Sequence, residues 1–120
     1  MIMDLSNKID IADAGQRFMN NDALFKKFLF RFPGETGFSQ LFQLLEEKNV
    51  EEAFRSAHTM KGLVANLALS SITGVLQPMT EVLRAGNMPE QSQIDELKQV
   101  YEEMLEIIAQ IQAEDIPLLS

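Results

Sequence analysis

The chain has 120 residues, no cysteine and a formal net charge of −8. This length supports one hydrophobic core but not two, so we predict a single domain over 1–120, with its core at about 9–113 and loosely ordered tails at 1–8 and 114–120. The lack of cysteine excludes disulfides and thiolate metal sites, and the negative charge opposes nonspecific binding to nucleic acid. No apolar run is long enough to span a membrane and no secretion signal opens the chain, so we expect a cytoplasmic protein.

Helical periodicity fills nearly the whole chain, with no strand pattern, repeat or low-complexity tract. Capping residues and glycine or proline breaks set the ends of the segments; Asn49 and Glu52, for example, have the spacing of a capping box. The predicted helices run from Asp10 to about Met19, from Asn21 or Asp22 to Phe32, from near Thr36 to Lys48, from Asn49 to about Leu69, from Ser70 or Ser71 to Gly86, and from after Pro89 to about Ala113.

Four of these helices are long and their connections are short. Such a pattern predicts an all-α fold, namely an antiparallel up-and-down four-helix bundle with one or two additional short N-terminal helices. In the last helix, the apolar residues recur at alternating steps of three and four, as in left-handed bundles. Pro78 interrupts the fifth predicted helix, and we expect a tolerated bend there.

The only histidine, His58, lies in the run Ala57-His58-Thr59-Met60-Lys61-Gly62. At about 100° per residue, the apolar residues of this helix fall on an arc opposite the imidazole, so the ring is predicted to point outward. Its own face carries cations one turn to either side and a glycine that leaves room for another molecule. The residues of this face that we single out are Phe54, Arg55, Lys61, Gly62, Ala65 and Leu69. Together they suit an incoming anion.

The motif His58-Thr59-Met60-Lys61-Gly62 resembles the His-x-x-Lys-Gly signature of histidine-containing phosphotransfer (HPt) domains. The similarity extends over about residues 9 to 113, including the segments at 17–32 and 44–49. Two features differ from the family pattern. Leu63 and Val64 stand where small residues are usual, and Ala68 replaces a glycine ten positions after the histidine. The first two fall on the core arc, so we expect them to alter packing more than chemistry.

The resemblance implies that His58 holds a phosphoryl group covalently, and we expect the outer ring nitrogen, Nε2, to attack phosphorus. Lys61 is the candidate for stabilising charge on the moving group, and Arg55 for steering or docking a partner. Phe54, Gly62, Ala65 and Leu69 form an apolar collar that suits a partner helix, although the N-terminal segment could instead cover Phe54.

The family also tends to supply a polar side chain from the next helix that accepts a hydrogen bond from the second ring nitrogen. Counted without gaps, this position is Thr80. Gln77 and Glu81 could take its place after a modest shift in register, and a bend at Pro78 could decide among the three.

The implied partners are receiver domains of response regulators or hybrid sensor kinases. The chain shows no nucleotide-binding motif, so we expect no cofactor and no metal on it, with Mg²⁺ on the receiver domain, and we expect a monomer. Two alternatives remain. The chain could be a degenerate adaptor that binds a kinase or receiver without transfer. It could also be a metal-dependent bundle enzyme, but these usually need Glu-x-x-His pairs, and Arg55 stands three residues before His58.

Overall fold

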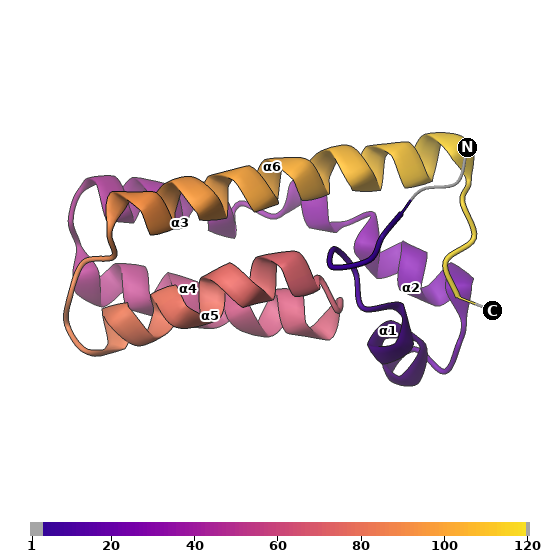
Figure 1. The fold of residues 1–120 in the computed structure, drawn as a ribbon, viewed down its shortest axis with the longest axis horizontal. Coiled ribbons are helices and arrows are strands. Elements are labelled where there is room, and N and C mark those ends of the chain that lie inside the picture. Colours follow the sequence, from indigo (N-terminus) through magenta and orange to yellow (C-terminus); the bar gives the residue numbers. More distant parts are fainter. Residues whose placement is uncertain (1–3, 120) are drawn as a thin grey trace.

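The computed structural model describes residues 4–119 and is all-helical over that range, as predicted. A bundle of four helices forms its body, and two short helices and a 3₁₀ turn precede it. In chain order the elements are α1 (Ile11–Arg17), α2 (Asp22–Leu29), η1 (Phe32–Gly34), α3 (Gly37–Glu46), α4 (Val50–Asn66), α5 (Ser70–Arg84) and α6 (Gln91–Glu114). Figure 1 shows α6 running along the bundle, with α1 and α2 at one end.

Local capping sets the starts of α1, α2 and α4. The side chains of Asp10, Asn21 and Asn49 each accept a hydrogen bond from the backbone N–H three residues later, so each satisfies one amide that the helix leaves without a partner. The predicted capping box at α4 is only half formed, because the carboxylate of Glu52 binds Arg55 at 2.6 Å.

Glycine ends α5 as predicted. Gly86 has a φ of 85°, and its N–H donates to the carbonyl of Leu83, while the N–H of Asn87 donates to the carbonyl of Val82. This pair of bonds is the Schellman motif, which satisfies the last carbonyls of the helix. Helix α5 continues through Pro78, which lies on its exposed side and therefore leaves the core packing intact.

Helix α4 ends three residues earlier than predicted. Asn66 is its last residue, and Ala68 has a φ of 57°, in the left-handed region that a non-glycine residue rarely adopts. The chain therefore turns over residues 67–69 before α5 begins. The glycine that is usual at position 68 in HPt domains would suit this backbone conformation.

The core lies where the helices of the bundle face one another. Contacts join α3 with α4, α4 with α5, and α5 with α6, so each helix packs on its neighbour in the chain. The largest fully buried side chains come from α2, η1, α3, α5 and α6 and from the turn before α5: Phe25, Phe32, Phe38, Leu29, Leu41, Leu69, Ile72, Leu76, Met79, Leu97, Met104 and Ile108. Burial of these apolar side chains is the main source of stability of the bundle.

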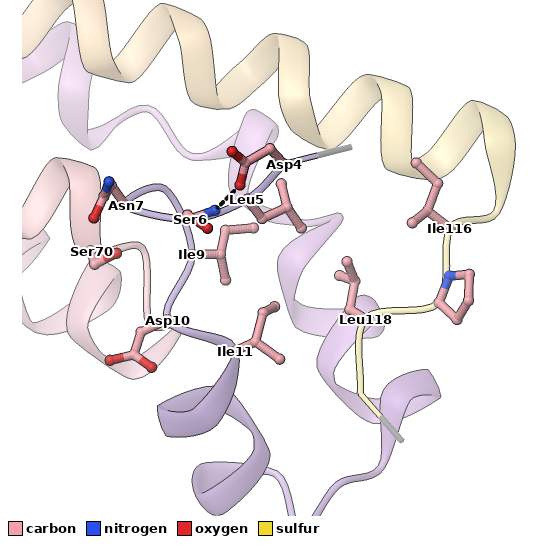
Figure 2. Close-up of a pocket in the computed structure, with 11 residues that line it drawn as sticks. Asp4, Leu5, Ser6, Asn7, Ile9, Asp10, Ile11, Ser70, Ile116 and Leu118 are labelled. Carbon is pink, nitrogen blue, oxygen red and sulfur yellow. Dashed lines mark hydrogen bonds between the residues drawn. The ribbon is translucent and has the colours of Figure 1, made fainter. Parts of the chain in front are cut away.

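The two terminal segments are tied to the end of the bundle that carries the α4–α5 turn. The N–H of Asp10 donates to the carbonyl of Ala68 at 2.8 Å, and the carboxylate of Asp22 accepts from the N–H groups of Leu118 and Leu119, at 2.9 Å each. A pocket of about 760 Å³ lies between these segments. Figure 2 shows the side chains that line it. Within residues 4–8, the ammonium of Lys8 binds the carboxylate of Glu103, and the carbonyl of Lys8 accepts from the N–H of Ser71. Both tails that were predicted to be loosely ordered thus make specific contacts, while residues 1–3 and 120 lie outside the described range.

Candidate functional site

His58 lies near the middle of α4 and is exposed, as the helical periodicity predicted. The opposite side of the same helix is in the core, since Ala53, Ala57 and Val64 are fully buried. The imidazole therefore projects from a helix that is fixed along its other face. Its ring stacks on that of Phe54, one turn earlier, with 5.9 Å between centroids and 29° between planes.

Lys61 lies one turn after His58 and is half-buried. No carboxylate oxygen of residues 4–119 is within ion-pair distance of its ammonium group. Because an i, i+3 spacing places two side chains side by side on a helix, the Lys61 charge is next to the imidazole and is not neutralised there. This arrangement can stabilise negative charge that arrives at the ring.

Arg55, the other predicted cation, is placed differently. Its guanidinium binds Glu51 at 3.0 Å and Glu52 at 2.6 Å, and the side chain remains exposed. Two carboxylates therefore offset its positive charge within the same helix. Of the two cations expected beside His58, only Lys61 has no carboxylate partner among residues 4–119.

Gly62 gives the site its open side. It is exposed, and a Cβ atom built at this position would meet no atom within 4 Å. Nothing inside the described part of the protein therefore requires a glycine here, although glycine in a helix costs about 1 kcal/mol relative to alanine. The residue leaves space for a molecule that approaches His58 from outside.

The predicted apolar collar is only partly formed. Phe54 and Ala65 are half-buried on the face of α4 that carries His58, and Arg84 of α5 lies over the Phe54 ring. The prediction for Leu69 was wrong: this residue is fully buried and contributes to the core. The helical periodicity does not apply to Leu69, because α4 ends at Asn66.

The candidates for orienting the imidazole lie on the next helix. Thr80 is fully buried, and its hydroxyl donates to the carbonyl of Leu76 at 2.7 Å. Gln77 and Glu81 are both exposed, and the Glu81 carboxylate binds Arg84 at 3.3 Å. Within residues 4–119, no hydrogen bond joins the His58 ring to any of these three side chains.

Arg84 is a residue of the site that was not predicted from the sequence. Its guanidinium carbon is 5.0 Å from the centroid of the Phe54 ring, a cation–π distance. A signal was present in the chain: in an antiparallel hairpin, positions equally far from the turn lie opposite each other, and Phe54 and Arg84 are equally far from Leu69. The pair thus links α4 and α5 next to His58.

Of the residues that differ from the HPt pattern, Val64 is fully buried and Leu63 is half-buried against the core. Both side chains thus contribute to packing, as the helical arc predicted. The described residues contain no group of three or more histidine, aspartate and glutamate side chains able to hold a metal ion. Within the same range, no helix is long and apolar enough to cross a membrane.

Comparison with known proteins adds one match. The family model described as Hpt domain matches residues 34–114, which is about two thirds of the chain and includes His58, Lys61 and Gly62. Helices α1 and α2 precede the matched range. Neither the curated proteins nor the solved structures gave a match.

Proposed function

We propose that this chain, which belongs to the Hpt domain family, reversibly carries a phosphoryl group on His58 between aspartates of receiver domains. The family implies a role in phosphotransfer within two-component signalling, and the relay through His58 is the specific form that we propose. The observation that carries it is the exposed imidazole with the unpaired Lys61 beside it and open space over Gly62.

The chemistry follows from the two nitrogens of a neutral imidazole. In this form one ring nitrogen offers a lone pair while the other carries a proton. The Nε2 lone pair attacks the phosphorus of an aspartyl phosphate; the N–P bond forms, the P–O bond to the aspartate breaks, and the carboxylate leaves with the bonding electrons. Transfer to an acceptor aspartate is the reverse of this step.

The chain contributes position and charge to this transfer. A phosphoryl group in flight spreads negative charge over its oxygens, so catalysis depends mainly on alignment and charge stabilisation. The Lys61 ammonium supplies charge from one turn away on a rigid helix. Mg²⁺, which would neutralise further charge, belongs in this proposal to the receiver domain. We also assign the relay to the cytoplasm.

A transfer assay against the receiver domains of the source organism tests the relay. Each receiver is phosphorylated with a labelled donor and mixed with the chain in the presence of Mg²⁺. We expect label on the chain that is labile to acid and stable to alkali, and none on His58→Gln. If none of the receivers transferred label to the chain, the proposal would be contradicted.

A second candidate function is the adaptor that binds a kinase or receiver without transfer. The observation that favours it is that Thr80 is buried and that, within residues 4–119, no side chain of α5 forms a hydrogen bond with the His58 ring. Binding of a receiver or kinase that is unchanged in His58→Gln, together with no transfer of label, would support this function over the relay.

A further inference from the structure

We infer that Phe54, held in place by Arg84, is a positioning residue that sets the plane of the His58 imidazole. The inference rests on the proposed function, because it concerns how His58 is prepared for phosphoryl transfer. It assigns to an aromatic ring the task that a hydrogen bond from α5 would otherwise perform.

An exposed imidazole needs such a restraint. Rotation about the bond between Cβ and the ring is broad for histidine, whereas in-line attack on phosphorus needs the nitrogen lone pair in one direction. Thr80 does not supply the restraint, because it is fully buried and, among residues 4–119, its hydroxyl forms its hydrogen bond with the carbonyl of Leu76 and none with the His58 ring. The contact that the structure gives the ring is the stack on Phe54.

The geometry of the stack is favourable. Phe54 precedes His58 by four residues, so the two side chains lie one above the other on α4. The centroid distance of 5.9 Å is within the range in which aromatic pairs attract each other. The planes are tilted by only 29°, so the pair is stacked, and rotation of the imidazole about its bond to Cβ would change that angle.

Phe54 can restrain its neighbour only if it is itself held, and α5 holds it. The ring is half-buried, and the guanidinium carbon of Arg84 lies 5.0 Å from its centroid. Arg84 in turn binds Glu81 one turn back on α5. The series Glu81, Arg84, Phe54 and His58 therefore connects the imidazole to two packed helices.

Small-molecule phosphorylation tests the inference without a protein partner. With phosphoramidate, the Nε2 lone pair forms an N–P bond to the donor's phosphorus, the donor's own P–N bond breaks, and ammonia leaves. We expect Phe54→Leu to label His58 about two- to tenfold more slowly, the range that the energy of one aromatic pair implies. Phe54→Tyr keeps the ring and should label at the wild-type rate, and Arg84→Gln should show a smaller loss than Phe54→Leu.

Phe28→Leu is the matched control, since Phe28 is exposed on α2 and also lies under an arginine, Arg31, at 5.2 Å. It should label at the wild-type rate. Circular dichroism shows whether each variant keeps its helices. Equal labelling rates in Phe54→Leu and wild type would overturn the inference, and so would an equal loss in Phe54→Tyr and Phe54→Leu.

NMR of the imidazole gives a readout that needs no phosphorylation. The ring protons of His58 should carry a ring-current shift that Phe54→Leu removes and Phe54→Tyr retains; a spectrum unchanged in Phe54→Leu would overturn the inference. A wild-type chain that accepts phosphate from phosphoramidate but from no receiver would contradict the relay alone. The two proposals can therefore fail separately.

Discussion

Replacement of Gly62 by alanine should make the protein more stable and worse at phosphotransfer. An added Cβ meets no atom within 4 Å, so the methyl group causes no clash in the isolated protein. Alanine is favoured over glycine inside a helix by about 1 kcal/mol, so the free energy of unfolding should rise by roughly that amount. For a domain of this size, the melting temperature should rise by about 4 °C.

The loss of transfer has a different cause. The methyl group occupies the space through which a receiver reaches the imidazole, and overpacking at a close contact costs about 1–3 kcal/mol. We expect transfer from a phosphorylated receiver to slow by about tenfold, measured as the initial rate of label transfer at a receiver concentration below saturation.

Gly74→Ala is the matched control, because Gly74 is also an exposed helical glycine with open space around its Cβ position. It should gain similar stability and keep the wild-type transfer rate. If Gly62→Ala gained stability and transferred at the wild-type rate, the argument that Gly62 leaves room for the partner would be refuted. Equal slowing in both variants would point to helix rigidity instead.

Three further predictions use other parts of the structure. Lys61→Gln should slow transfer by about two- to fivefold. Arg55→Gln should change the rate by less than about twofold in the same assay, because Glu51 and Glu52 already offset the charge of Arg55. Equal losses in the two variants would contradict the different roles given to the two cations. Gly37→Ala should lower the free energy of unfolding by about 1–2 kcal/mol in urea titration, because the added Cβ would collide with the sulfur of the buried Met60 side chain. An unchanged midpoint would refute this. Although partial burial raises the pKa of Asp22, the amide of Leu119, the ammonium of Lys26 and the amide of Leu118 together hold that pKa below 3.8. Asp22→Asn should therefore cost about 1–2 kcal/mol at pH 7 by denaturant titration, and the difference from wild type should shrink as the pH falls through about 4 and below; a difference independent of pH would contradict the role of the charge.

Local chemistry explains what could be predicted from the sequence. The caps Asp10, Asn21 and Asn49 and the break at Gly86 act within a few residues, so they are readable in the chain itself. The outward direction of His58 follows in the same way, because the periodicity of one helix decides which face is buried.

The features that were missed depend on chain conformation or on distant contacts. Ala68 adopts a left-handed conformation that an alanine in the sequence does not indicate. The prediction for α4 therefore extends too far and assigns Leu69 to the exposed face, although it is buried. The bonds of Asp22 to Leu118 and Leu119 join residues nearly a whole chain apart, and no local pattern reveals such a pair. The Arg84–Phe54 contact lies between these two cases in how well the sequence predicts it, because only the register of the α4–α5 hairpin is needed.

The most direct test of the relay is to locate the phosphoryl group on the chain after incubation with a phosphorylated receiver domain and Mg²⁺. Mass spectrometry under alkaline conditions identifies the modified residue, and ³¹P NMR identifies the ring nitrogen. We predict one phosphoryl group, on Nε2 of His58, that returns to unphosphorylated receiver when this is added. Phosphate on another residue, or a chain that stays unmodified with every receiver of the source organism, would contradict the account.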